Sequence, residues 1–196
     1  IKGTTIYDKR TFEPLYNNYL RKKLALKDIY EIAQRITNRY RNDGYILSKA
    51  IVPQQKIKNG VVYLRIVEGF IDKIKIQGPV RGPRKLVDHY RKKILKSRPL
   101  RAFDLERYLL LIDDLPGVTA KSVLTPSEDI PNATTMTLIL SDKAFEGHVG
   151  TDNRGSKFNG PYQFSGDLTA NSLFGNHSRS GLQGVLTSQT EELLFL

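Results

Sequence analysis

An internal repeat of about 75 residues constrains the fold of this chain more than any other feature of its sequence. Hydrophobic periodicity predicts the order strand, helix, helix, strand, strand over residues 1–69, and the same order over residues 70–144. Equivalent positions of the two copies lie 73 to 75 residues apart: Gly3 and Gly78, Gly44 and Gly117, Leu64 and Leu138. A module this small buries a core only if its two helices cover one face of a three-stranded sheet. The other face of each sheet and at least one edge are therefore expected to stay open.

The spacing of apolar residues places the elements of each copy. In the first copy it predicts the end of a strand at Ile1–Gly3 and helices around Phe12–Leu20 and over Leu26–Asp43. In the second copy it predicts strands over Phe70–Pro79, Thr119–Thr125 and Thr134–Ser141, and helices over Pro83–Leu95 and Asp104–Leu115.

The stretch Gly44–Gly69 is predicted to be a helix stop followed by a β-hairpin. Asn59-Gly60 lies between alternating apolar runs and suits a type I′ turn, in which both central residues have φ > 0. Pro53 interrupts the first of these runs, and a proline gives no N–H to a ladder, so this strand is expected at a sheet edge. An edge strand is either protected against pairing or used for it.

Residues 145–196 differ in composition and charge from the rest of the chain. Residues 1–144 hold 28 Lys and Arg against 15 Asp and Glu, whereas residues 145–196 hold 3 against 5 and are rich in Gly, Ser, Asn and Thr. Small or apolar side chains alternate with polar ones from Tyr162 to Asn171, and strands are expected at 145–154, 162–171 and 180–189. The pattern fits membrane-spanning β-strands with a lipid face and a wet face, and it equally fits a half-buried hairpin.

The sequence offers little for catalysis, metal or nucleotide binding. It has no cysteine, and His89, His148 and His177 are scattered without partners at ligand spacing, so no metal site is expected. Neither strand–helix junction continues as a glycine-rich phosphate loop. Asp113-Asp114 at a helix end suits a solvent-exposed position better than acid–base catalysis, and no nucleophile–base set is visible. The net charge of +11 indicates either attraction to anionic partners or solvated helix faces.

Four motifs in order resemble one family along essentially the whole chain. They are Ala50–Gln55 (AIVPQQ), Asn59-Gly60 with Val67–Gly69 (VEG), Leu115–Val118 (LPGV) and Asp152–Ser156 (DNRGS). Together they resemble the two-partner secretion transporters of the haemolysin-activation and filamentous-haemagglutinin secretion type. The resemblance implies an α+β chain of two tandem β-α-α-β-β POTRA modules followed by antiparallel strands of a truncated transmembrane β-barrel.

The resemblance also implies domain boundaries. Residues 1–69 would be a first POTRA domain with an incomplete first strand, 70–144 a second, and 145–196 the first barrel strands. Asp152, Asn153 and Gly155 would form the turn that follows the first barrel strand, where Asn and Gly tolerate φ > 0.

The function implied is non-enzymatic. The chain would be the recognition part of a transporter in the outer membrane of a Gram-negative bacterium, with residues 1–144 in the periplasm. It would bind an unfolded exoprotein, such as a haemolysin or adhesin, in extended form and pass it to the barrel. The client of such a transporter is usually encoded beside it. No cofactor, small-molecule substrate or nucleic acid is expected.

Client binding is predicted to occur by β-augmentation at the edge strands. Residues 48–57 are the first candidate and 119–125 the second, with the contacts expected at Ser48, Ala50, Val52, Gln54, Gln55, Lys56, Thr119, Lys121 and Val123. Pro53 keeps its strand at the edge but also removes one donor, which would hinder a client. Basic runs at Arg21–Lys23 and Arg91–Lys93 would attract acidic clients or are simply solvated.

Two alternatives remain open at the level of the sequence. One is an outer-membrane protein assembly factor of the same superfamily, although AIVPQQ and DNRGS favour secretion. The other is a basic α+β module that binds nucleic acid, which would need aromatic residues on the open sheet face, where only Tyr63 is plainly placed.

Overall fold

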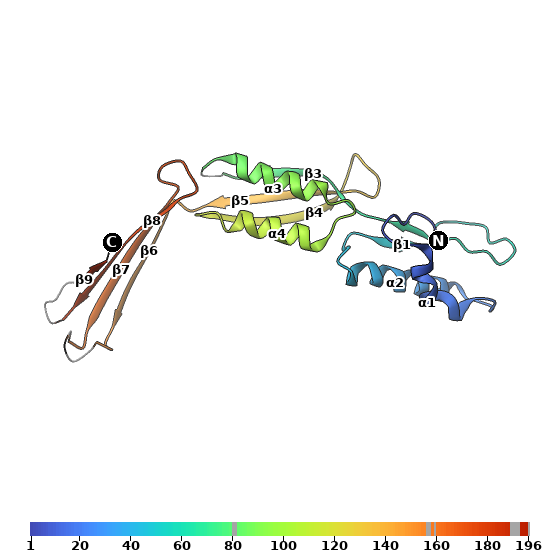
Figure 1. Ribbon diagram of the computed structural model, residues 1–196, viewed down its shortest axis with the longest axis horizontal. Helices are drawn as coiled ribbons and strands as arrows, with labels where there is room; N and C mark the ends of the chain where they lie inside the picture. The colour runs from blue at the N-terminus through green and yellow to red at the C-terminus, as the bar shows by residue number, and fades with distance from the viewer. Residues whose placement is uncertain (80–81, 156–157, 159, 189–192, 196) are drawn as a thin grey trace. The chain divides into compact units, whose positions relative to one another are not determined.

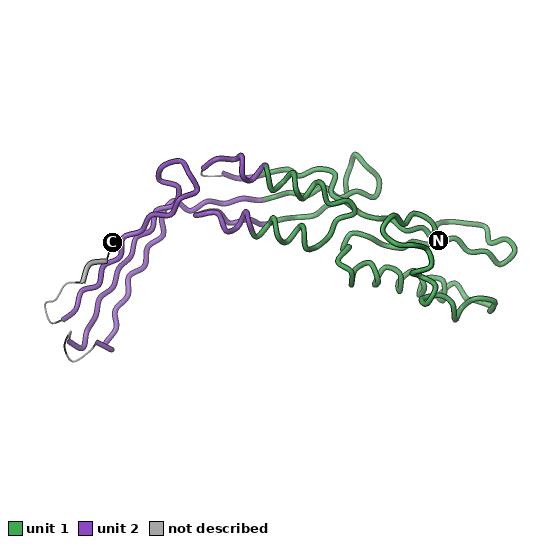
Figure 2. The backbone as a smooth tube through the Cα atoms, in the orientation of Figure 1, with its two compact units in different colours: residues 1–76, 89–110, 122–138 green, residues 77–88, 111–121, 139–196 purple. Residues whose placement is uncertain are grey.

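The computed structural model describes residues 1–79, 82–155, 158, 160–188 and 193–195. These residues form two compact units (Figure 2): residues 1–76, 89–110 and 122–138 in one, and residues 77–88, 111–121 and 139–196 in the other. The α+β class predicted from the sequence is confirmed, with helices and antiparallel strands following one another along the chain (Figure 1). The domain boundaries after residues 69 and 144 stay a prediction.

The first helical region is broken where one helix was predicted. Instead of a single helix over Phe12–Leu20, the chain forms η1 (Lys9–Phe12), α1 (Glu13–Tyr16) and η2 (Asn17–Tyr19). Pro14 lies in the first turn of α1, where proline is tolerated, and the two asparagines that follow are weak helix formers. Helix α2 (Leu26–Asn42) forms as predicted, and its Asp28 carboxylate accepts a hydrogen bond of 2.8 Å from the Ala25 N–H.

The core of this region is built from one side of α2 and the strands beneath it. Its buried members are Phe12, Ile29, Ile32, Ala33, Ile36, Tyr40, Leu64 and Ile66. The Tyr40 ring stacks on Phe12 with centroids 6.0 Å apart. The predicted apolar stripe of α2 is therefore the side that the protein buries.

The hairpin between Gly44 and Gly69 is regular only at its base. Strand β1 (Lys49–Ile51) pairs antiparallel with β2 (Arg65–Val67), and Lys2 bridges to Arg65 in parallel on the other side. The turn is as predicted, since Asn59 and Gly60 have φ of 53° and 70°. The strands are shorter than predicted because the ladder stops where Pro53 would have to donate.

The second copy has the same strand arrangement. Its elements are β3 (Ile71–Gln77), α3 (Arg84–Lys96), α4 (Ala102–Asp113), β4 (Val118–Pro126) and β5 (Thr134–Asp142), with sheet order β3-β5-β4. Helices α3 and α4 lie side by side over one face of this sheet (Figure 1). Buried apolar residues come from every element: Ile71, Ile74, Val87, Ile94, Leu105, Ile112, Val118, Met136, Leu138 and Leu140.

The repeat is visible in the backbone at Gly3 and Gly78. Both have φ above +90°, and a Cβ at either position would overlap the carbonyl oxygen of the central strand, Ile66 in the first copy and Leu140 in the second. Only glycine allows the outer strand to approach the central strand this closely. The recurrence of Ile-Lys-Gly as Ile-Gln-Gly therefore has a steric cause.

The last part of the described chain is a four-stranded antiparallel sheet. It consists of β6 (Phe145–Asp152), β7 (Gln163–Asn171), β8 (Arg179–Thr187) and β9 (Leu193–Phe195) in that order, one strand more than the three predicted. The register places Leu168 opposite Gly147 and Leu182, and Phe164 opposite Thr151 and Leu186, so one face is apolar as predicted. These large apolar side chains are exposed: Val149, Phe164, Leu168, Leu182 and Leu186.

Across the described residues, no helix combines the length and the apolar character needed to cross a membrane.

Candidate functional site

Two amides along the outer edge of the first hairpin are already hydrogen-bonded, one just before β1 and one within it. The Ser48 N–H donates to the Tyr45 carbonyl at 3.0 Å, and the Ala50 N–H donates to the Thr37 hydroxyl of α2 at 3.0 Å. Thr37 in turn donates to the Ala33 carbonyl at 2.9 Å. Ser48 is also buried, at 1% exposure, which removes its side chain from any surface that a client could contact.

Pro53 has a different effect from the one predicted. The outward N–H groups belong to Ala50 of β1 and to Ser48 just before it, both even-numbered, so by alternation the nitrogen of Pro53 faces β2. Pro53 therefore removes a donor from the hairpin's own ladder and leaves the outer edge unchanged. The prediction that it would deprive a client of a donor is wrong.

Gln55 replaces the hydrogen bonds that Pro53 cannot complete. Extending the register from Ile51↔Arg65 places Pro53 opposite Tyr63. The Gln55 carboxamide accepts from the Tyr63 N–H at 2.7 Å and donates to the Tyr63 carbonyl at 2.9 Å. A side chain thus imitates one pair of backbone groups, and Gln55 is occupied in holding the hairpin.

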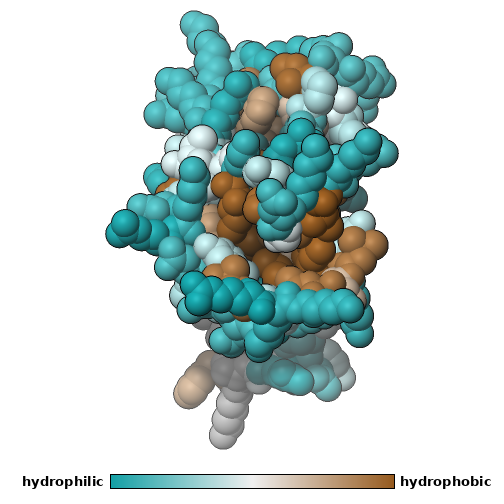
Figure 3. Space-filling model, turned by 90° about the vertical axis from the view of Figure 1, so that its right-hand side faces the viewer, coloured by the Kyte–Doolittle hydropathy of each residue, from teal (hydrophilic) through white to brown (hydrophobic). Residues whose placement is uncertain are grey.

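The part of the first hairpin that extends beyond β1 and β2 is here called the hairpin arm. Apolar hollows lie on both sides of it (Figure 3). One of about 410 Å³ is lined by Val52, Gln54 and Gln55 of the predicted site together with Leu26, Ile29, Tyr30, Pro53, Ile57 and Val62. A second, of about 540 Å³, shares Ile29 and Val62 and extends to Tyr16, Tyr19 and Leu20. Lys56 is exposed on the arm itself. The structure therefore gathers Val52, Gln54 and Gln55 around one groove beside α2.

Strand β4 has the longer open edge. Its Val118 N–H donates to the Leu115 carbonyl at 2.9 Å, and its Ala120 N–H donates to the Asp113 carboxylate at 2.7 Å, both away from β5. By alternation, the N–H and C=O groups of Ser122 and Leu124 also point to this outer edge. The edge of β4 therefore continues beyond Ala120, the residue that Asp113 contacts, to the end of this nine-residue strand.

The side chains predicted on β4 share one face of the sheet. Thr119, Lys121 and Val123 are exposed, whereas Val118 is buried on the helix side. Because side chains alternate along a strand, these three residues lie on the face that the helices leave open. An extended segment paired with β4 would place its own alternate side chains beside them.

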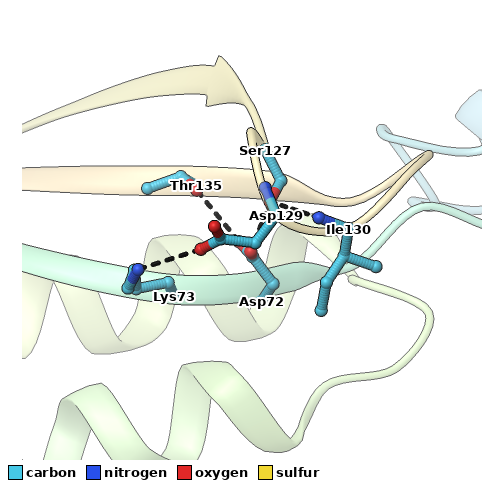
Figure 4. Close-up of polar contacts among 6 residues, drawn as sticks. All are labelled: Asp72, Lys73, Ser127, Asp129, Ile130 and Thr135. Carbon is cyan, nitrogen blue, oxygen red and sulfur yellow. Dashed lines mark hydrogen bonds and ion pairs between the residues drawn. The ribbon is translucent and has the colours of Figure 1, made fainter.

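A polar cluster fixes the loop that follows β4 (Figure 4). Asp72 of β3 accepts hydrogen bonds from the hydroxyls of Ser127 and Thr135, and the Ser127 hydroxyl accepts from the amides of Asp129 and Ile130. Burial by itself would raise the pKa of Asp72, but the hydrogen bonds from Ser127 and Thr135 prevail and lower it. The loop is thereby held against β3, where Lys73 pairs with Asp129 at 3.0 Å.

A second carboxylate holds the base of the first hairpin. Glu68 accepts hydrogen bonds from the Thr5 N–H at 2.8 Å, the Thr5 hydroxyl, the Ile6 N–H and the Tyr40 hydroxyl at 2.7 Å. Burial opposes the charged form, yet these donors lower the pKa of Glu68 below its ordinary value. Burial of the Tyr40 hydroxyl, together with its hydrogen bond to Glu68, raises the pKa of Tyr40. The glutamate of the VEG motif therefore ties the start of the chain to β2.

The described residues of the Asp152–Ser156 motif, Asp152 to Gly155, lie at the end of β6 with a backbone that differs from the one expected. Asp152 accepts from the Arg154 N–H at 2.9 Å, as expected for a turn. Gly155 has no left-handed φ, contrary to prediction; a Cβ there would instead overlap the carbonyl oxygen of Gly160. Asn153 is exposed, and Ser156 lies outside the described residues.

In the described part of the chain, no group of three or more His, Cys, Asp or Glu side chains is arranged to hold a metal ion.

The sequence did not predict two helix residues whose side chains bond to the edge strands. Thr37 and Asp113 each place a helix side-chain oxygen on an outward amide of the neighbouring edge strand. A signal existed for Thr37, which is a polar residue among the apolar positions of the buried stripe of α2. Asp113 was interpreted only as a solvent-exposed acid at a helix end.

Comparison with known proteins supports the family resemblance. Residues 1–69 match the family model of the POTRA domain, ShlB-type. The heme/hemopexin transporter protein HuxB of Haemophilus influenzae is 30% identical over 162 residues, which are 82% of this chain and 29% of HuxB. The outer membrane transporter CdiB of Dickeya dadantii is 28% identical over 174 residues, or 88% of this chain and 30% of that protein.

Solved structures agree on the fold. The structure of CdiB from Escherichia coli superposes with a TM-score of 0.70 at 23% identity, covering 97% of this chain and 35% of CdiB. The N-terminal domain of Omp85 from Thermosynechococcus elongatus superposes with a TM-score of 0.58 at 17% identity, covering 72% of this chain and 63% of that one.

Fold and sequence together define a POTRA-containing protein. Residues 1–69 match the ShlB-type POTRA domain family, and the chain is similar over most of its length to the outer-membrane transporters HuxB and CdiB. It spans less than a third of the length of the curated relatives named above.

Proposed function

We propose that this chain is the periplasmic recognition part of a two-partner secretion transporter, which binds an unfolded exoprotein and passes it to a barrel begun by residues 145–196. Similarity to outer-membrane transporters, together with the POTRA match, supports the general role. The observation that carries the finer proposal is the open edge of β4, where Ser122 and Leu124 present backbone donors and acceptors outward. An extended client would pair with this edge, and its alternate side chains would meet Thr119, Lys121 and Val123.

This proposal reverses the order in which the two edges were predicted. The β1 edge keeps its groove beside α2, but Ser48 and Ala50 have no amide to offer a client. Backbone pairing supplies affinity that tolerates many client sequences, as a carrier of long unfolded chains requires. Strand β4 is therefore the primary edge in this proposal, and the groove lined by Val52, Gln54 and Gln55 is secondary.

A proline at Ser122 tests the proposal with little risk to the fold. Proline there removes an N–H that points outward, so the β4–β5 ladder is kept. The binding partner is the unfolded amino-terminal segment of the exoprotein encoded beside this gene. Ser122→Pro should weaken binding about tenfold, because a lost backbone pair exposes unmatched polar groups on both partners.

Ser122→Ala is the matched control, since it keeps the N–H and should bind like the parent. Equal binding by both variants would show that the client does not pair with β4. Failure of the parent chain to bind the segment at all would remove the proposed recognition function itself.

A further inference from the structure

The outward side of α3 carries a stripe of basic side chains. Val87 and Ile94 are buried and mark the side that faces the sheet. On the opposite side, exposed side chains recur at helical spacing: Lys85, His89, Lys92 and Lys96, with Lys93 beside them. The structure thus converts charges that are scattered in the sequence into one continuous row.

The outward side of α4 carries large apolar side chains. Leu105 and Ile112 are buried against the sheet, whereas Phe103 and Leu110 are 61% and 62% exposed. Arg107 lies between them at the intervening turn of the helix and is also exposed. This outward row is unusual because it exposes two of the most hydrophobic residue types on a helix that already has a buried side.

These two rows belong to one surface. Helices α3 and α4 lie side by side on the same face of the sheet (Figure 1), and the rings of Tyr90 and Tyr108 stack between them with centroids 6.0 Å apart. We refer to the exposed residues Lys92, Lys93, Lys96, Phe103, Arg107 and Leu110 as the basic–apolar surface.

The acids of α4 lie beside the basic–apolar surface and not within it. The Asp104 carboxylate accepts a hydrogen bond from the Ser97 hydroxyl at 2.7 Å at the base of the helix, and Glu106 lies on the flank of the row. The outward side of α2 is different, since Glu31 pairs with Arg35 at 2.7 Å and Gln34 bonds Asn38 at 2.9 Å. The outward row of α2 therefore mixes acidic and basic side chains, whereas the outward row of α3 holds lysines and a histidine.

We propose that the basic–apolar surface lies against a membrane leaflet that contains anionic phospholipids. Lysines on flexible stems reach lipid phosphates, while Phe103 and Leu110 insert between headgroups. The outer-membrane location in the proposed function, on which this inference rests, brings such a leaflet near. This contact is separate from client capture at β4, and each can hold without the other.

The test uses the whole chain with one fluorophore. Because the chain has no cysteine, Glu106→Cys places a single polarity-sensitive label beside the surface, and Gln34→Cys places one on α2. The probes are phosphatidylcholine vesicles with and without phosphatidylglycerol. The exposed apolar face of β6, β7 and β8 can hold the chain on either vesicle, so the signal that counts is the local one at position 106.

The expected result is a blue shift at position 106 with phosphatidylglycerol vesicles only, and no shift at position 34. One basic residue near the surface changes the affinity roughly fivefold, so Lys92→Gln, Lys93→Gln and Lys96→Gln together should weaken the response roughly a hundredfold. The matched control removes three charges elsewhere, at Arg21, Lys22 and Lys23, and should retain the response.

Three results would overturn the proposal. The first is an equal shift with vesicles of phosphatidylcholine alone, and the second is an equal loss in the control triple variant. The third concerns Phe103→Ser with Leu110→Ser: if this pair leaves the blue shift at position 106 unchanged while soluble polyglutamate binds the same lysines, the surface attracts acidic chains and not a membrane.

Discussion

Replacing Gln55 with alanine should loosen the first hairpin at one backbone position. Gln55 makes two hydrogen bonds to the Tyr63 backbone, at 2.7 and 2.9 Å. After the substitution, the Tyr63 N–H can turn to the Pro53 carbonyl, but the Tyr63 carbonyl has no donor because proline lacks an N–H. One net hydrogen bond between neutral groups contributes about 1 kcal/mol. The free energy of local opening should fall by that amount.

Amide hydrogen exchange at Tyr63 measures this opening directly. Gln55→Ala should speed exchange about fivefold, whereas Gln54→Ala, whose side chain is exposed, should not change it. Pro53→Ala restores a backbone donor opposite Tyr63, so Gln55→Ala should have a much smaller effect in that background. An equal effect of Gln55→Ala with and without Pro53 would refute the idea that the side chain replaces the missing ladder bond.

Three further substitutions test other parts of the structure. Thr37→Val should remove the acceptor of the Ala50 N–H, lower stability by about 1 kcal/mol and speed exchange of that amide; unchanged exchange would contradict the bond. The pKa of Glu68 is lowered in the folded chain, so the charged carboxylate should stabilise the fold fully above about pH 4.3, the ordinary pKa of glutamate. This stabilisation should be lost as the pH falls through the lower pKa of the folded state. In urea titrations, Glu68→Gln should therefore reduce the loss of stability on acidification, and an unchanged loss would contradict the role of this carboxylate. Gly78→Ala should destabilise by more than about 2 kcal/mol, because its Cβ would overlap the Leu140 carbonyl and φ is left-handed; a small loss in thermal unfolding would argue against the close approach.

The sequence was most informative where structure follows from periodicity. The apolar stripe of α2, the turn at Asn59-Gly60 and the alternating face of β7 are set by local spacing, and all three are present as predicted. The prediction of a single helix at Phe12–Leu20 was wrong, because residues in this segment have weak helix propensity. The chain forms three short helical segments there instead.

The candidate site was less predictable because it depends on contacts across the fold. Whether an edge amide is free depends on a side chain from a helix, as with Thr37 and Asp113, and no local pattern shows that contact. The direction in which Pro53 lacks a donor depends on the strand register, which is fixed only when the hairpin forms. Pro53 thus correctly indicated an edge strand, but the expectation that it would remove a donor from a client was wrong.

In the proposed function, the two edges of the repeated module differ in how much of each is open. In each copy, one outward amide of the edge strand donates a hydrogen bond to a helix side chain. The Ala50 N–H donates to Thr37, and the Ala120 N–H donates to Asp113. In β1 that amide is the middle of a three-residue strand, so the contact covers most of the edge. In β4 it is the third residue of a nine-residue strand, so more than half of the edge lies beyond it. If the proposed pairing is correct, strand length should decide which copy accepts another chain more than the protecting contact does, since a client needs consecutive outward groups to gain from pairing.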